Sequence, residues 1–101
     1  MPQFTTRVEL YGTPSNETYN LLHSAMAVNK FSRNIKGTDG KIYELPHAVY
    51  YSYGNLTCKE VMNLAINSAK TVWKDFAVVT TITDQLIESY NLKPAKQALF
   101  Q

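Results

Sequence analysis

The sequence predicts one α+β domain with the element order β-α-β-β-α-β, in which a four-stranded antiparallel sheet carries two helices on one face. Three observations support this prediction: apolar and β-branched patterns of strand type near both ends of the chain, two amphipathic stretches preceded by capping residues, and an Asp-Gly turn between them. A chain of 101 residues with 45% hydrophobic and 18% charged residues has the size and composition of a single globular domain.

The first strand and the first helix are expected in the first thirty residues. Over residues 4–11 apolar and polar side chains alternate with the period of two that a half-buried strand requires. Turn-forming residues follow, and Ser15 or Asn16 can accept a hydrogen bond from an unpaired amide of the next helical turn. Over residues 16–29 apolar side chains recur at three- and four-residue spacing, which predicts a helix packed on the sheet.

A hairpin is expected in the middle of the chain. Residues 31–36 run into a turn at residues 37–40, whose Asp-Gly pair favours the positive φ angles of a tight reversal. The return arm, residues 41–45, stops at Pro46 because proline cannot donate a ladder hydrogen bond, and it resumes over residues 47–53. We therefore expect this arm to be the third strand, interrupted by a bulge or a bend.

The second helix has the sharpest local signal in the chain. Thr57 and Glu60 stand three residues apart, the spacing of a reciprocal capping box. The apolar residues between positions 61 and 73 then share one helical face. Residues 76–83 are rich in β-branched and apolar side chains, which favours a central strand of the sheet.

The domain is expected to occupy residues 1–92 and to be followed by a flexible polar tail over residues 93–101. Thr83 or Asp84 can cap a short C-terminal helix near residues 85–90. The complete order of elements is the ferredoxin-like arrangement.

The composition indicates a cytoplasmic protein. The longest apolar runs are a few residues, against the ~20 that a membrane-spanning helix needs, and the N-terminus lacks the basic and apolar regions of a secretory signal. The single cysteine, Cys58, can form no internal disulfide, which agrees with a reducing compartment, and we expect its thiol to be inert.

His23 and His47 are the candidate catalytic residues. Residues 10–16, at the end of the first strand, contain no Asp or Glu, and no paired carboxylates or metal-binding histidine spacing occur elsewhere, so we expect no metal and no cofactor. RNA cleavage without metal needs a base for the 2′-hydroxyl proton and a cation for the phosphorane. The apolar neighbours of His23 favour a half-buried imidazole over a base, whereas His47 begins a strand, where exposure is easy.

A basic segment with aromatic neighbours is the candidate RNA-binding surface. Residues 30–41 carry four basic side chains against Asp39 alone, a net charge of +3. Cations can contact phosphates while aromatic rings stack on bases. The tyrosines can equally serve as sheet formers, and the lysines as a solvated hairpin. The candidate residues are Lys30, Arg33, Lys36, Lys41, Tyr51 and Tyr53.

Three short stretches allow a comparison with known families: Tyr-Gly-Thr-Pro-Ser at residues 11–15, Leu-Leu-His-Ser-Ala-Met at residues 21–26 and Phe-Ser at residues 31–32. Together they resemble the GhoS-like family of type V antitoxin endoribonucleases. The resemblance covers most of the chain in the order and spacing of elements, with few identical residues. It implies a ferredoxin-like fold similar to the CRISPR adaptation nucleases, and cleavage of single-stranded RNA, the messenger of a toxin, in a bacterial toxin-antitoxin system.

Two positions depart from this resemblance. Gly12 stands where the nuclease relatives place an acidic residue, and His23 stands where one member of the family has an arginine. The alternative function is a non-enzymatic protein-interaction module, such as a phage or mobile-element inhibitor of a host defence factor, or an antitoxin that binds protein. Small size and a tyrosine-rich sheet suit that function as well, because tyrosine is a common anchor of protein interfaces. In both cases we expect a monomer or a homodimer that does not bind membranes.

Overall fold

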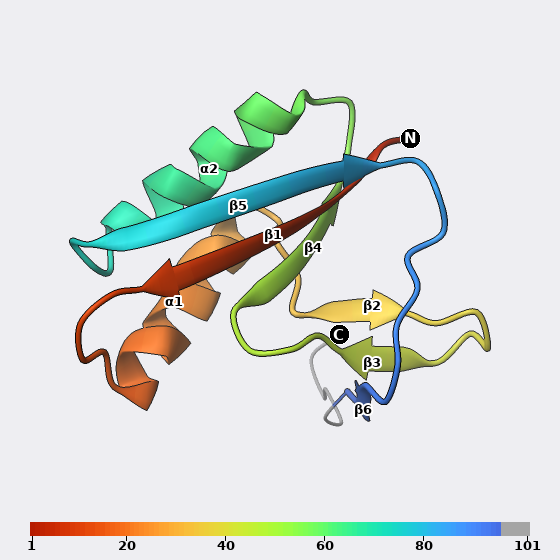
Figure 1. Cartoon of the computed structure of the whole chain (residues 1–101), viewed down its shortest axis with the longest axis horizontal. Helices are drawn as coiled ribbons and strands as arrows, with labels where there is room; N and C mark the ends of the chain where they lie inside the picture. Colours follow the sequence, from red (N-terminus) through yellow and green to blue (C-terminus); the bar gives the residue numbers. More distant parts are fainter. Residues whose placement is uncertain (96–101) are drawn as a thin grey trace.

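A three-stranded antiparallel sheet with β1 at its centre organises the fold (Figure 1). In this computed structural model, which describes residues 1–95, β1 (Gln3–Leu10) lies between β4 (Val49–Tyr53) and β5 (Phe76–Thr83). Alternate residues of β1 are buried, as the period of two predicts. Together with the two helices described next, this sheet confirms the predicted α+β class.

Both predicted helices are present and lie on the same face of this sheet (Figure 1). α1 (Asn16–Val28) begins after Ser15, whose Oγ accepts a hydrogen bond from the Thr18 amide at 3.1 Å. α2 (Cys58–Lys70) begins with the predicted capping box, since the Glu60 amide donates to Thr57 and the Glu60 carboxylate accepts from the Thr57 amide. Each box satisfies two amides that the first helical turn leaves unpaired.

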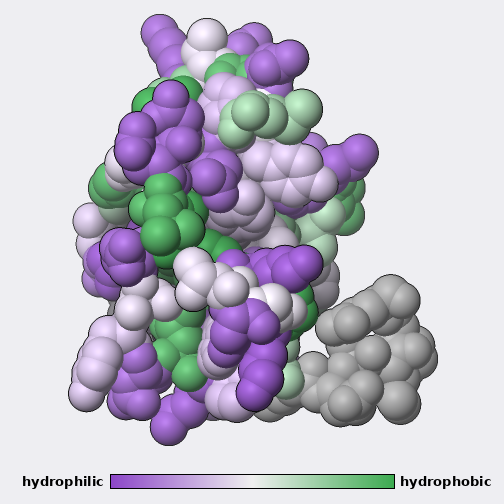
Figure 2. Space-filling model, turned by 90° about the vertical axis from the view of Figure 1, so that its right-hand side faces the viewer, coloured by the Kyte–Doolittle hydropathy of each residue, from purple (hydrophilic) through white to green (hydrophobic). Residues whose placement is uncertain are grey.

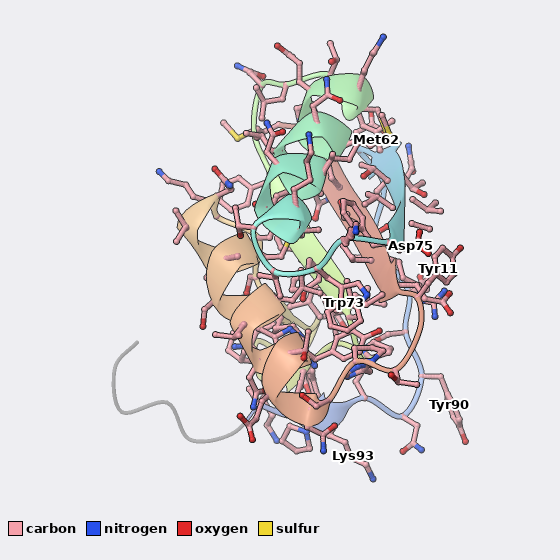
Figure 3. The ribbon with its side chains drawn as sticks, turned by 90° about the vertical axis from the view of Figure 1, so that its left-hand side faces the viewer. Tyr11, Met62, Trp73, Asp75, Tyr90 and Lys93 are labelled. Atoms are coloured by element: carbon pink, nitrogen blue, oxygen red, sulfur yellow. The ribbon has the colours of Figure 1, made fainter. Side chains whose placement is uncertain are left out.

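The core lies between this sheet and the helices. Tyr50 of β4 is its largest fully buried side chain, and Phe31, just after α1, packs against it with ring centroids 6.4 Å apart. α2 ends at Lys70, so Trp73 lies beyond the helix, where its indole N–H donates to the Tyr11 carbonyl at 2.7 Å (Figure 3). The buried core comprises Phe4, Val8, Leu10, Leu22, Met26, Phe31, Tyr50, Val61, Ala65 and Ala69.

A second, smaller antiparallel sheet contains the predicted hairpin. β2 (Asn34–Lys36) pairs with β3 (Ile42–Glu44), and β3 pairs with β6 (Lys93–Pro94). Gly40 has a φ of +83° in the hairpin turn, a conformation that glycine adopts without strain. The Asp-Gly signal therefore located this turn correctly.

The prediction of one four-stranded sheet is wrong, because the described residues form two sheets of three strands each. The return arm breaks between β3 and β4, where Ala48 adopts a φ of +60° and the Val49 amide donates to the Pro46 carbonyl. This turn redirects the chain, so β3 and β4 enter different sheets. The hairpin arm contacts the larger sheet through one bridge, in which Ser32 and Tyr51 exchange two hydrogen bonds of 2.7 Å.

The C-terminal part also differs from the prediction. Strand β5, predicted to be central, lies at an edge of its sheet among the described residues. The predicted helix near residues 85–90 is absent, and this segment runs without regular structure past the hairpin to β6 (Figure 1). Of the predicted tail, Lys93 and Pro94 pair with β3, whereas residues 96–101 lie outside the described residues.

Candidate functional site

The two predicted catalytic histidines lie close together, with ring centroids 6.0 Å apart. His23 comes from α1 and is held on both ring nitrogens. Its Nδ1 lies 2.7 Å from the Tyr50 hydroxyl, and its Nε2 lies 2.9 Å from Nη1 of Arg33, which precedes β2. We call His23, Arg33 and Tyr50 the histidine–arginine cluster.

The hydrogen bonds of this cluster define the protonation of His23. A guanidinium can only donate, so Nε2 of His23 accepts from Arg33, and the neutral ring carries its proton on Nδ1 and donates to Tyr50. Burial, then the charge of Arg33, then that of His47, lower the pKa of His23 from 6.5 to about 4. His23 is thus neutral at pH 7, and its only lone pair is already used. This arrangement suits a structural role better than the predicted role of a base.

Arg33 is mostly an internal side chain. Its Nη2 donates to the Leu45 carbonyl at 3.4 Å and lies 3.6 Å from the Glu44 carboxylate, and only 22% of the side chain is exposed. Its Nε is buried without a partner in the described structure. Arg33 therefore ties α1 to the end of β3, and little of its guanidinium is free to contact a phosphate.

His47 is the accessible histidine. Its ring packs edge-on against Tyr19 at 4.3 Å, and the Tyr19 hydroxyl accepts a hydrogen bond from the Leu10 amide, which fixes that ring. His47 lines a shallow groove of about 350 Å³ together with Lys93 and Tyr90. Both of these side chains point away from the core at one end of the molecule (Figure 3).

Sequence reasoning missed Lys93 and Tyr90. They were assigned to a tail and to a short helix, and they reach the groove because β6 pairs with β3. A two-residue strand has no pattern from which it can be predicted.

The second candidate region is an aromatic surface on the sheet face opposite the helices. Tyr51 and Tyr53 of β4 project from this face with ring centroids 6.1 Å apart, and 67% of Tyr53 is exposed. The Tyr51 hydroxyl donates to Gln3 of β1 at 2.8 Å, so its ring has a defined position. Lys36 lines a cavity of about 250 Å³ with Tyr51, and Lys30 lines one of about 270 Å³ with Tyr53. We call Tyr51, Tyr53, Lys30 and Lys36 the tyrosine platform.

The structure thus separates the six predicted RNA-binding residues. Lys30, Lys36, Tyr51 and Tyr53 form the platform, whereas Arg33 belongs to the histidine–arginine cluster. Lys41 lies at the hairpin turn, where its amide donates to Asp39. Figure 2 shows the side of the molecule with the hairpin turn as mostly hydrophilic, interrupted by hydrophobic patches.

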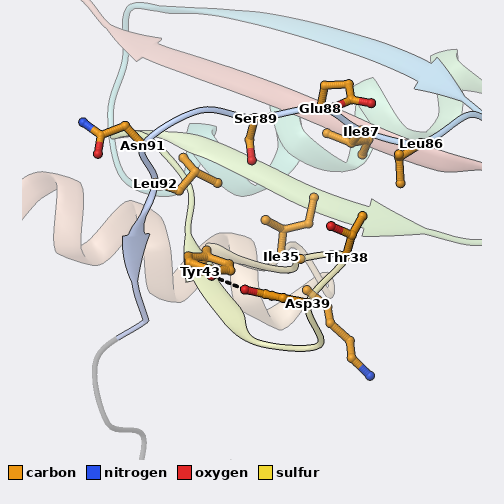
Figure 4. Close-up of a pocket in the computed structure, with 12 residues that line it drawn as sticks. Ile35, Thr38, Asp39, Tyr43, Leu86, Ile87, Glu88, Ser89, Asn91 and Leu92 are labelled. Carbon is orange, nitrogen blue, oxygen red and sulfur yellow. Dashed lines mark hydrogen bonds between the residues drawn. The ribbon is translucent and has the colours of Figure 1, made fainter.

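A cavity of about 410 Å³ lies between the hairpin and residues 86–92 (Figure 4). Among its lining residues, the Tyr43 hydroxyl donates a hydrogen bond of 2.5 Å to the Asp39 carboxylate, and this bond is the main cause that lowers the pKa of that carboxyl group. Lys36 is the one cation among its lining residues, and no histidine reaches it. The sequence could not indicate this cavity, because one wall is the segment that was predicted to be a helix.

Among residues 1–95, no three His, Cys, Asp or Glu side chains come together as metal ligands would. No helix in that range has the length and apolar character needed to cross a membrane. Comparisons with protein-family models, curated proteins and solved structures found no match.

Proposed function

We propose that this chain binds single-stranded RNA across the tyrosine platform, as an antitoxin of the GhoS-like type. The observation that carries the proposal is the pair of neighbouring tyrosine rings on a sheet face that neither helix covers. Lys36 shares a cavity with Tyr51, and Lys30, just after α1, shares a cavity with Tyr53 at the edge toward the helices. Every base has a π-face that can stack on tyrosine, and the lysines can neutralise the phosphates on either side.

The fold supports this proposal when it is interpreted as ferredoxin-like. The Ser32–Tyr51 bridge lies beside β4, so the order bridge, β4, β1, β5 corresponds to a ferredoxin-like sheet whose second strand is reduced to one residue. RNA-binding domains of this architecture stack bases on the sheet face opposite the helices. Tyr51 and Tyr53 occupy that face here.

If the chain is also an endoribonuclease, cleavage of the bound RNA would depend on His47. His47 is exposed and shares a groove with Lys93, so it could take the 2′-hydroxyl proton while the lysine approaches the phosphate. His23 cannot take this proton without losing its hydrogen bond from Arg33. A His47→Ala variant that still binds RNA but no longer cleaves it would support this role, and unchanged cleavage would contradict it.

The Tyr53→Ala variant tests the platform directly. Stacking of a base on an aromatic ring is worth about 1–3 kcal/mol, so we expect the variant to bind a fluorescent single-stranded RNA roughly 5- to 150-fold more weakly. Anisotropy titrations at fixed salt measure this effect. Tyr11→Ala is the matched control, because Tyr11 is 46% exposed and lies outside both the platform and the His47 groove. Equal affinity of the Tyr53 variant and the wild type would refute the platform.

The Lys30→Ala/Lys36→Ala variant tests the electrostatic part. Each lost phosphate contact reduces the slope of log affinity against log salt by about 0.7 for a single strand, so we expect the slope to fall by about 1.4. Lys59→Ala/Lys70→Ala makes the same change in net charge at exposed positions of α2, outside the platform, and should leave the slope within about 0.3 of the wild type. An equal change of the slope in both double variants would mean that only net charge matters.

Absence of RNA binding together with a stoichiometric protein partner would favour the protein-interaction module.

A further inference from the structure

The outer edge of β5 has no charged residue, proline or bulge to prevent it from pairing with a strand of another molecule. Its eight residues include no charged side chain and no proline, and one edge faces β1 while the other faces no strand among residues 1–95. Natural edge strands are commonly protected by lysine, proline or a bulge. This strand is long and regular, and two of its large apolar side chains, Val79 and Ile82, are 65% and 46% exposed.

The backbone groups that face this edge can be assigned from the ladder with β1. The Tyr11 amide donates to the Asp75 carbonyl at 2.9 Å, just beyond the end of β5. Hydrogen-bonded pairs alternate in an antiparallel ladder, so odd-numbered residues of β5 bond to β1 and even-numbered residues point away from it. The Cys58 thiol donates to the Thr80 carbonyl at 3.3 Å, which agrees with this assignment. A carbonyl oxygen has a second lone pair, so Thr80 can still accept a ladder hydrogen bond.

We propose that two copies of this chain pair through the β5 edge, antiparallel to each other, with Val79 opposite Val79 of the second copy. In this register Phe76 lies opposite Ile82, and Val78 lies opposite Thr80, so all four outward-facing residues find partners. The two Val79 residues form a non-hydrogen-bonded pair of the new ladder, the kind of pair in which facing side chains approach most closely. The two three-stranded sheets become one continuous sheet.

Charge complementarity selects this register. Lys74 and Asp84 flank β5, and with Val79 at the centre each lysine lies opposite the aspartate of the other copy, twice by symmetry. Centring the pair on Val78 or Thr80 would instead place Asp84 opposite Val72 or Phe76. Apolar side chains of α2 extend the proposed interface. Met62 and Ile66 are only half-buried, and Figure 3 shows Met62 on the side of α2 toward β5.

The dimer is independent of RNA binding, but it would extend the proposed RNA surface. A two-fold axis perpendicular to the sheet keeps both tyrosine platforms on one face. Five strand spacings separate the two β4 strands, which is about 24 Å. One RNA strand of moderate length could then contact both platforms.

Oligomeric state and cross-linking test the proposal. Sedimentation equilibrium of the wild type between 5 and 200 µM should give a species of twice the 11.5 kDa chain mass. The Val79→Lys variant would place two ammonium groups at the two-fold axis of the dimer, so it should be monomeric. Val79→Thr keeps a β-branched side chain and should remain dimeric. A monomeric wild type throughout this range overturns the proposal.

Disulfide formation tests the register. In a Cys58→Ser background, Val79→Cys brings two thiols into facing positions and should cross-link rapidly under mild oxidation. Thr81→Cys in the same background is the matched control, because residue 81 would face Ala77 and its two copies would lie about 13 Å apart. Equal cross-linking of both variants overturns the register, and so does failure of Val79→Cys to cross-link in a dimeric sample. The Tyr53→Ala titration shows separately whether the platform binds RNA, because Tyr53 lies outside the β5 edge.

Discussion

Replacing Tyr50 by alanine is expected to lower the free energy of unfolding by about 3–5 kcal/mol, the usual cost of removing a large aromatic side chain from a core. Tyr50 has no exposed surface, and its ring packs against Phe31 and His23. The change leaves a cavity and also removes the hydroxyl that binds Nδ1 of His23. A domain of this size has a total stability of about 5–15 kcal/mol, so the variant would be near its folding limit.

Urea unfolding followed by circular dichroism measures this loss, and Tyr53→Ala is the matched control. Tyr53 lies on the same strand but is largely exposed, so its change should alter stability by less than about 0.5 kcal/mol. Tyr50→Phe should cost about 1–3 kcal/mol, because the ring remains while the proton on His23 loses its acceptor. Similar losses for Tyr50→Ala and Tyr53→Ala would contradict the core described above.

Most of the individual elements could be predicted because their signals are local. The capping box at Thr57 and Glu60 predicts the start of α2 to the exact residue. The alternation in β1 and the Asp-Gly turn are also signals that involve only neighbouring residues. Such signals describe how one segment folds. They do not say which sheet the segment joins, and that is where the predicted fold was wrong.

The division into two sheets depends on one backbone conformation without a sequence signal. Ala48 adopts a positive φ, which is uncommon for alanine, and separates β3 from β4. Pro46 predicted an interruption but not the change of sheet. β6 is only two residues long, too short for any hydrophobic period, so its pairing with β3 could not be anticipated.

The candidate site was predicted in composition but not in arrangement. Arg33 and Lys36 both counted as basic residues of one segment, yet Arg33 turns inward to His23 while Lys36 is exposed. The difference arises from packing between α1 and the hairpin, which a charge pattern cannot reveal. The sequence correctly favoured a half-buried, hydrogen-bonded His23, because its apolar neighbours indicated burial.

Arg33→Met is expected to lower the free energy of unfolding by about 2–3 kcal/mol, even though the new side chain fills a similar volume. The change leaves Nε2 of His23 and the Leu45 carbonyl without their donor, and an unpaired buried polar group costs about 1–3 kcal/mol. Loss of the positive charge should also raise the pKa of His23 from about 4 toward 6.5, because Arg33 is the second-largest cause of its depression after burial.

The pH dependence separates this role from a simple loss of packing. The pKa of His23 is lower in the folded than in the unfolded chain, so its neutral form stabilises the fold above pH 6.5 and this contribution is lost as the pH falls toward 4. In Arg33→Met the two pKa values lie closer together, so stability should vary less over this range. NMR titration of the His23 ring and urea unfolding at pH 7 and 4.5 measure both effects. Lys36→Met removes the same charge from an exposed site and should leave the titration unchanged; an unshifted His23 pKa in Arg33→Met would show that Arg33 does not control this histidine.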